Sequence, residues 1–189
     1  MRMNAGWRAM GPADLDRVMA IAEVVHPDYP EERAVFAERL ALYPDGCAMA
    51  EAFGAEAFGA EVSRAEASGA EAGGPCIGYI VMHPGRLGVP PPLDSPLGAL
   101  PEVPDCLYLH DVALLPAARG LGLGVAALER MNALAARQGF RWMALTSTPG
   151  ARAFWDAQGF RPHDGGAGLA AKLASYGGGM TYMTKPVTG

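Results

Sequence analysis

The sequence predicts a single domain, residues 1–189, of the mixed α/β (α+β) class. A chain of 189 residues has the length of one ordinary domain. Short runs of β-favouring residues alternate along it with segments of helical periodicity. Residues 106–146 also place a strand, a glycine turn, a helix and a second strand in succession, which is a βαβ-like unit.

The N-terminal part predicts one strand followed by two helices. A mixed run at residues 7–10 favours the strand, which a Gly-Pro pair closes. Residues 13–25 place apolar side chains at steps of three and four, with aspartates in the first turn, as is typical of an amphipathic helix. A second helix is expected over residues 30–42, because a proline and two glutamates mark its start.

Two further strands are expected at residues 47–53 and 75–83, around a low-complexity tract. The tract, residues 50–74, repeats a five-residue theme five times and carries five Glu and one Arg. Because it follows neither the helix nor the strand period, we expect a solvated loop insertion in a hairpin. An acidic arm that recruits a basic partner is the alternative. Residues 84–104 hold seven of the 16 prolines and predict a long irregular loop, a kind of segment that is often functional.

The most regular region begins with a strand at residues 106–115 and a turn at 116–119. Alternate glycines at positions 120, 122 and 124 then open a helix that runs to about residue 138. Its expected buried face consists of Val125, Leu128, Met131, Leu134 and Ala135. Gly139 is the expected C-cap, and residues 140–146 predict the next strand.

The C-terminal part predicts a short helix and two strands. The helix covers residues 151–158 and stops at Gly159. Residues 160–162 and 180–186 predict strands on either side of a glycine-rich connector.

The formal charge of −5 is concentrated in the repeats. Outside them, 14 basic and 15 acidic residues nearly balance, without the basic excess of a nucleic-acid-binding protein. No apolar run reaches the roughly 20 residues of a membrane-spanning helix, and residues 1–10 lack the apolar segment of a secretory signal. We therefore expect a cytoplasmic protein with no membrane or nucleic-acid partner. Cys47, Cys76 and Cys106 fit neither a disulfide framework nor paired metal ligands, so no metal site is expected.

The turn before the glycine helix has the features of an anion-binding site. The first amides of a helix lack intrahelical acceptors and lie at the positive end of its dipole. Glycine at positions 122 and 124 lets a phosphate approach those amides, and Arg119 can add a charge-assisted contact. A glycine turn needed only for packing is the alternative. A dinucleotide-binding GxGxxG motif is not matched, because Val125 occupies a position that needs a small residue, and a P-loop lysine is absent.

These residues carry a resemblance to the GNAT family of N-acetyltransferases. Residues 112–124, VALLPAARGLGLG, are similar to the family's acetyl-CoA signature, a V-x-P turn followed by R/Q-x-x-G-x-G/A. Residues 153–160, AFWDAQGF, are similar to its late A-x-F-Y-x-x-x-G-F element, and Trp7-Arg8 with Asp14 to its opening strand and helix. Most of the chain outside the repeats and the proline-rich loop follows the family's order of elements.

The resemblance implies a mixed, mostly antiparallel central sheet that is splayed at the acetyl-CoA site and flanked by helices. The pantetheine arm would pair with the backbone of Val112, Ala113 and Leu114. The pyrophosphate would be held by Arg119 and by the amides of Gly120, Leu121, Gly122, Leu123, Gly124 and Val125. The expected cofactor is therefore acetyl-CoA, with Trp155 as a wall of the pantetheine site or as a core aromatic.

Attack of an amine on a thioester needs a base, an oxyanion donor and an acid for the departing thiolate. His110 lies nine residues before Arg119, a position that resembles that of a histidine in the arylalkylamine acetyltransferase branch, which helps to deprotonate the amine through water. Asp111 is the rival base or an orienting residue, and Tyr108 stands where that branch has a second histidine. Each of the three also has a purely structural interpretation. Strand alternation predicts that one face carries Tyr108, His110 and Val112 and the other Leu109, Asp111 and Ala113.

The sequence departs from the family at the residue that protonates the departing thiolate. Trp155 replaces the usual tyrosine, and an indole cannot act as a phenol acid. The thiolate proton is left to water, to Tyr176 or Tyr182, or to the ammonium product. Ser147, at the end of its strand, is either a cofactor contact or a turn residue.

The expected function is an acetyl-CoA-dependent N-acetyltransferase that acts on a primary amine by direct attack in a ternary complex. A catalytically silent acyl-CoA-binding sensor is the alternative. Tyr29, Phe36 and His83 are candidates for the acceptor side. A small, partly apolar amine is the first choice of acceptor, ahead of a protein N-terminus or an antibiotic. The sequence does not decide the oligomeric state, and a homodimer is one of the possibilities.

Overall fold

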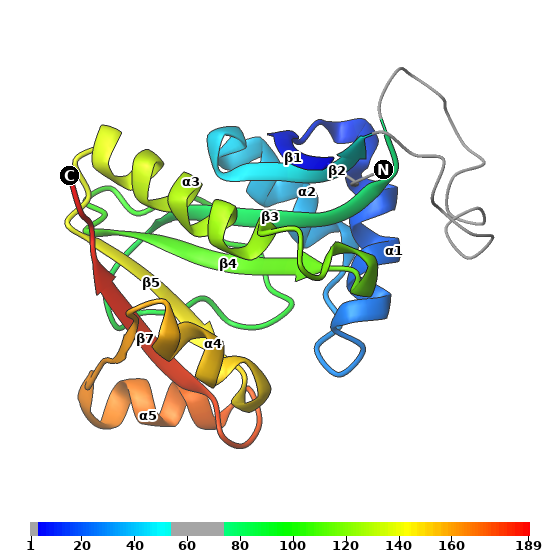
Figure 1. The fold of residues 1–189 in the computed structure, drawn as a ribbon. Coiled ribbons are helices and arrows are strands. Elements are labelled where there is room, and N and C mark those ends of the chain that lie inside the picture. The colour runs from blue at the N-terminus through cyan, green and yellow to red at the C-terminus, as the bar shows by residue number, and fades with distance from the viewer. Residues whose placement is uncertain (1–3, 54–73) are drawn as a thin grey trace.

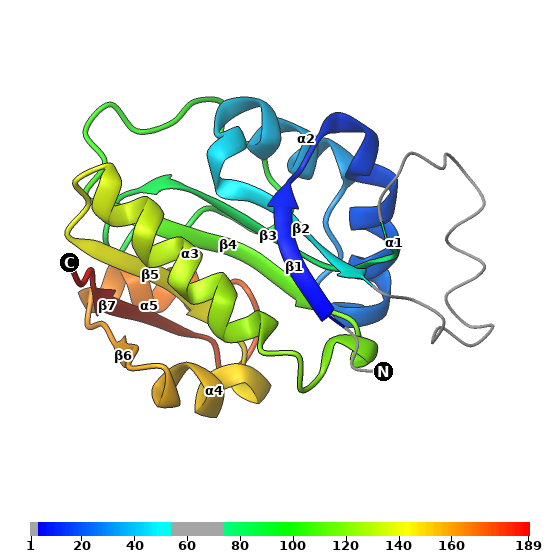
Figure 2. The ribbon, with the colours of Figure 1, turned by 45° about the horizontal axis from the view of Figure 1, so that its top comes forward.

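The computed structural model describes residues 4–53 and 74–189, which form one seven-stranded sheet with helices on both faces (Figure 1, Figure 2). In spatial order the strands are β1 (Asn4–Ala9), β2 (Cys47–Phe53), β3 (Cys76–Gly85), β4 (Cys106–Leu114), β5 (Trp142–Ser147), β7 (Thr181–Pro186) and β6 (Arg161–Pro162). Neighbouring strands are antiparallel except β4 and β5, which are parallel. The helices are α1 (Leu15–Val25), α2 (Arg33–Leu42), α3 (Leu123–Arg137), α4 (Arg152–Ala157) and α5 (Gly166–Ala174). The predicted fold class is confirmed.

The two ends of α3 follow from glycine. Gly122 precedes the helix at φ +74°, and Gly139 follows it at φ +75°. The N–H groups of Gly139 and Phe140 donate back to the carbonyls of Ala136 and Ala135, at 3.1 and 2.9 Å. This pair of bonds satisfies the last carbonyls of the helix, as the sequence predicted for a glycine C-cap.

Helix α5 lies in the glycine-rich connector between the last two strands, for which we predicted no helix. Its sequence, GAGLAAKLA, contains two glycines, each of which disfavours a helix by about 1 kcal/mol relative to alanine. However, Leu169 is buried against Tyr108 and Tyr182 on the sheet. Tertiary packing therefore outweighs the local preference at this point.

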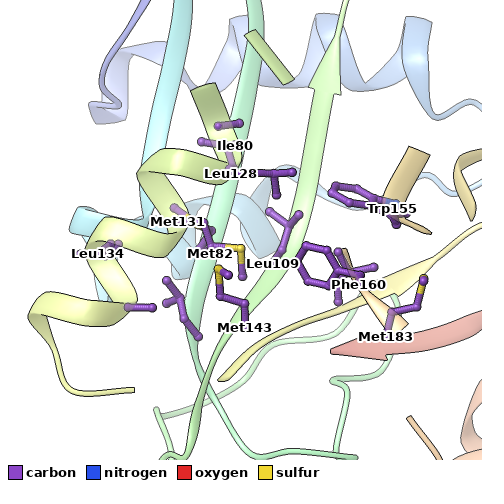
Figure 3. Close-up of a cluster of buried hydrophobic side chains, with 14 of the residues drawn as sticks. Ile80, Met82, Leu109, Leu128, Met131, Leu134, Met143, Trp155, Phe160 and Met183 are labelled. Atoms are coloured by element: carbon purple, nitrogen blue, oxygen red, sulfur yellow. The ribbon is translucent and has the colours of Figure 1, made fainter. Parts of the chain in front are cut away.

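The core is divided by the sheet. Helices α3 and α4 cover one face, where Leu128 and Met131 pack against Leu109 and Trp155 (Figure 3). The opposite face is covered by α1 and α2, through residues such as Val18 and Phe36, and farther along by α5. In Figure 2, α3 and α4 lie in front of the sheet, with α1, α2 and α5 behind it or at its end. Among the described residues, no helix is long and apolar enough to cross a membrane.

Strands β4 and β5 separate along their length. They pair only where residues Cys106–Leu109 meet Trp142–Leu145. Beyond Leu109, β4 continues beside β3, whereas β5 continues beside β7. Figure 1 shows the two strands diverging from a common end. One edge of β4 is therefore left without a partner strand in the described part of the chain.

A β-bulge breaks the alternation of β4. Val81 of β3 pairs with Asp111, while the next residue, Met82, pairs with Leu109, so His110 is an extra residue in β4. Simple alternation placed His110 and Asp111 on opposite faces, and this prediction is wrong. Both side chains contact the connector between α1 and α2. Val112, predicted on the face of His110, packs instead with Leu109 on the side of α3.

The proline-rich loop after β3 is shorter than predicted, because Pro84 and Gly85 complete that strand. Contacts with α2 fasten the rest of it. Glu38 accepts the N–H groups of Leu97 and Gly98, at 2.7 and 2.9 Å, and Asp94 accepts the N–H of Glu32 at 2.6 Å. Strand β2 likewise includes residues 50–53, the first of the repeats. The remaining repeats, residues 54–73, lie outside the described residues.

Candidate active site

The glycine turn forms an open cradle at the start of α3. Gly120 and Gly122 both have left-handed backbones, at φ +78° and +74°, which favour glycine. A Cβ at either position would have no neighbour within 4 Å among the described residues, which leave the space in front of the turn free. The first amides of α3 lie beside this space, where the helix itself supplies no acceptor. The indole of Trp7 donates to the carbonyl of Leu123 at 3.3 Å and ties the turn to β1.

A cavity of about 620 Å³, here called the cradle cavity, extends from this turn along β4. Arg119, Gly120 and Gly122 line one end, and Val112 with Trp155 lines the other. Its wall also includes Phe154, a residue to which we assigned no role from the sequence. Phe154 is 40% exposed and lies 3.4 Å from the position that a Cβ of Gly124 would take.

Of three further residues that we predicted to hold the cofactor, Val125 borders the cradle cavity, whereas Leu121 and Ala113 do not. Val125, predicted on the buried face of α3, is 47% exposed at the rim of the cradle cavity. Leu121 packs against the core beneath β2 and β3, and Ala113 is buried under α1 and α2. Neither Leu121 nor Ala113 belongs to the lining of this cavity in the described residues.

A second cavity, of about 160 Å³, lies on the other side of the splay and is here called the polar cavity. Tyr108, His110 and Asp111 border it, as do Pro91 and Pro92 of the proline-rich loop. The two cavities share Leu109, Val112, Ala151 and Trp155. These four residues lie near the gap where β4 and β5 have separated, so the two cavities adjoin there and share this wall.

Two carboxylate–imidazole pairs line the polar cavity. Nε2 of His110 lies 2.8 Å from Oε2 of Glu31, and both side chains are more than nine-tenths buried. Nε2 of His26 lies 3.0 Å from Oδ1 of Asp111 and 3.2 Å from the carbonyl oxygen of Val112. In each pair a carboxylate holds one ring nitrogen, so Nδ1 is the nitrogen left for other chemistry.

The groups around Asp111 keep that carboxyl ionised. Burial alone would raise its pKa, but hydrogen bonds from His26 and Tyr79 and the nearby positive charge lower the pKa of Asp111 below its ordinary value. Burial likewise opposes protonation of His26. The hydrogen bond and charge of Asp111, with the charge of Glu31, nevertheless raise the pKa of His26 above 6.5. The second pair is therefore an ion pair over a wider pH range than a free histidine would allow.

Of the remaining aromatic candidates, two border the polar cavity and two are buried in the core. Tyr29 and Tyr176 border the polar cavity. The hydroxyl of Tyr176 donates to the carbonyl of Pro91 and so fastens the loop that closes the cavity. Phe36 is a core residue, 1% exposed, against Tyr79. Tyr182 is buried behind Tyr108, with ring centroids 6.1 Å apart.

Of three further polar candidates, two form hydrogen bonds within the protein and the third is buried behind aromatic rings. Tyr108 shares a hydrogen bond of 2.9 Å with Thr146, and burial raises its pKa. Ser147 donates to the carbonyl of Thr148 at 2.8 Å, which is the behaviour of a turn residue. His83 is 3% exposed behind the rings of Tyr108 and His110, and burial lowers the pKa of His83 to about 4.

Sequence reasoning missed His26 and Glu31. Glu31 served there only to mark the start of the second predicted helix, and His26 was given no functional role. Their chemistry depends on the bulge in β4, which turns both His110 and Asp111 toward this connector. The sequence does place a histidine and a glutamate in one short connector. This combination points to a site only once it is known that the connector lies against His110 and Asp111 of β4.

Comparison with known proteins gives a family match over most of the chain. Residues 21–160 match the model of the acetyltransferase (GNAT) family. No curated protein matches the chain.

Solved structures with this fold are numerous and distant in sequence. Ard1 from Thermoplasma volcanium superposes with a TM-score of 0.63 at 14% identity, over 98% of this chain and 99% of that one. Naa50 from Arabidopsis thaliana, in complex with a CoA-containing bisubstrate analogue, gives 0.61 at 14% identity, over 96% and 98% of the two chains. GphF, a GNAT-like decarboxylase in complex with isobutyryl-CoA, gives 0.63 at 17% identity, over 97% and 100%. At these identities the likeness establishes the fold alone.

Proposed function

Because the chain belongs to the acetyltransferase (GNAT) family, we propose that it transfers the acetyl group of acetyl-CoA to a small primary amine. The family and its CoA-bound neighbours support acyl-CoA-dependent transfer in general. The amine, the mechanism and the acetyl donor are our proposal. The observation that carries it is the meeting of two cavities at the splay, one with an anion cradle and the other with two carboxylate–imidazole pairs.

The cradle cavity fits a CoA-type ligand. The turn at Gly120 and Gly122 leaves free space that a phosphate can occupy, next to the first amides of α3 and to Arg119. The unpaired edge of β4 beyond Leu109 offers backbone groups to an extended arm. When bound, the cofactor supplies the activated acetyl group as a thioester.

His110 is the proposed base. Glu31 accepts the hydrogen bond from Nε2, which orients the ring and leaves Nδ1 to accept a proton from the amine, directly or through a water. Glu31 is itself held by the backbone N–H of Asp94 at 3.1 Å, from the proline-rich loop. The loop thus closes the polar cavity and also positions the group that orients the base.

The size and lining of the polar cavity favour a small acceptor. Its volume of about 160 Å³ is below that of most pockets for drug-sized ligands, about 300–1,000 Å³. Pro91, Pro92, Leu93 and Tyr176 provide apolar contacts for a short carbon skeleton. Glu31 and Asp111 are the carboxylates that can attract its ammonium group.

The test is acetyl-CoA turnover against a panel of small primary amines, short peptides with free N-termini and aminoglycosides. We expect CoA release with formation of an N-acetylated small amine, identified by mass spectrometry. Turnover of peptides alone would overturn the choice of acceptor. Tight CoA binding without turnover of any amine would favour an acyl-CoA sensor.

A further inference from the structure

The position that usually carries the family's acid holds an indole. Trp155 is buried and borders both cavities, yet its ring has one N–H donor and no group that titrates as a phenol does. A thiolate that leaves in the gap between β4 and β5 therefore needs another proton donor. In the part of the chain that the structure describes, the titratable residues that line the polar cavity are His26, Tyr29, Glu31, Tyr108, His110, Asp111 and Tyr176.

Most of these groups are committed elsewhere. His110 is the proposed catalytic base and Glu31 is the carboxylate that orients it, whereas Asp111 is ionised and has no proton to give. The hydroxyl of Tyr108 is bonded to Thr146, and that of Tyr176 donates to the carbonyl of Pro91. Burial raises the pKa of Tyr176 to about 12, which makes it a poor acid at neutral pH. His26 remains, with Tyr29 as its rival.

His26 has the geometry of a proton donor. Its Nε2 is anchored by Asp111 Oδ1 at 3.0 Å and by the carbonyl oxygen of Val112 at 3.2 Å. Val112 borders both cavities, so the ring is attached to the strand at the place where they meet. The side chain is 28% exposed, which allows its proton to be renewed from solvent.

We propose that His26, oriented by Asp111, is the catalytic acid that protonates the departing CoA thiolate in place of the missing tyrosine. This inference rests on the proposed acetyl transfer. The amine nitrogen uses its electron pair to form the C–N bond, and the C–S bond breaks with its pair left on sulfur. His110 accepts the proton that the nitrogen loses, and His26 gives its Nδ1 proton to sulfur. Solvent then takes a proton from His110 and returns one to His26.

The charges that face His26 favour this role. Asp111 of β4 and Glu31 before α2 are carboxylates near the ring, and Tyr79 of β3 stabilises Asp111 from behind. Against the burial of the ring, these carboxylates raise the pKa of His26. A larger fraction of His26 is therefore protonated near neutral pH than of an ordinary histidine.

The first test needs no turnover. The thiol of enzyme-bound CoA is titrated by the ultraviolet absorbance of the thiolate, in the wild type, in His26→Gln and in Val24→Ala, an exposed control two residues away on α1. A neighbouring imidazolium stabilises the thiolate, so we expect the bound thiol in the wild type and in the control to titrate about 1–3 pH units lower than in His26→Gln. Identical titrations in the three proteins would overturn the proposal.

The second test uses the acetylated amine as readout. His26→Gln should lower kcat by about 10²- to 10⁴-fold and remove the basic limb of the pH profile. Imidazole added to His26→Ala should restore rate in proportion to its protonated form. A loss of kcat with the basic limb intact and no rescue would make His26 merely structural, and loss of that limb in Tyr29→Phe would assign the acid to Tyr29. If the wild type acetylates no amine, the proposed function fails, while the thiol titration still tests His26.

Discussion

Replacing Gly122 by alanine separates ligand binding from backbone strain. Gly122 and Gly139 flank α3 with nearly the same backbone, φ +74° and +75°, and at neither position would a Cβ find a neighbour within 4 Å in residues 4–53 and 74–189. A left-handed alanine is disfavoured by about 1–2 kcal/mol. Gly122→Ala and Gly139→Ala should therefore lower the free energy of unfolding by similar amounts, with a fall in Tm of about 2–4 °C for each kcal/mol in a protein of this size.

Only one of the two variants should lose affinity for CoA. Gly122 lines the cradle cavity, whereas Gly139 caps the far end of α3. A distorted cradle forfeits at least one hydrogen bond to a charged phosphate, which contributes about 1.5–3 kcal/mol. This corresponds to a rise in Kd of about 10- to 150-fold for Gly122→Ala, measured by calorimetric titration with CoA beside thermal unfolding of the free proteins. An unchanged Kd in Gly122→Ala, or an equal rise in both variants, would refute the assignment of the cradle.

Other parts of the account are open to equally direct measurement. His110→Gln should lower kcat by about 10²- to 10⁴-fold with little change in the Kd for CoA, and full activity would exclude it as the base. Glu31→Gln should lower kcat by less than His110→Gln does, with little change in the Kd for CoA, and an unaltered kcat would contradict its orienting role. Because burial lowers the pKa of His83 from 6.5 to about 4, the unfolded chain takes up a proton there that the folded chain does not, so stability falls as the pH drops through this window. Between pH 7 and pH 4 this amounts to about 3 kcal/mol, which urea unfolding should show to be missing in His83→Gln. Replacing residues 54–73 by Asn-Gly should leave amine turnover and CoA affinity intact, and loss of turnover alone would favour an interaction arm.

The sequence was sufficient for most of the fold. Strand β2 was predicted with both its ends, and Gly139 and Gly159 end α3 and α4 with left-handed backbones, as expected. Local rules suffice there, because period and capping chemistry reside in neighbouring residues. Helix α5 was missed because its stability depends on the burial of Leu169 against the sheet, which no local rule reports.

In the candidate site, too, one part could be predicted from local sequence and the other could not. The glycine cradle is a local device at one helix end and could be found in the sequence. The polar cavity is assembled from a bulge in β4, a connector before α2 and a loop after β3. The bulge inserts one residue, His110, and thereby changes the side of the sheet on which the next residues lie. Period-two reasoning cannot detect such an insertion, so the pairing of His110 with Glu31 and of Asp111 with His26 could not be predicted.

A crystal structure of the protein with CoA tests the central claim most directly. The account predicts the pyrophosphate on the amides at Gly120 to Gly124 and the sulfur in the gap between β4 and β5, bordered by Val112 and Trp155 and within reach of His26. A pyrophosphate bound elsewhere, or a sulfur that does not reach the junction of the two cavities, would contradict it.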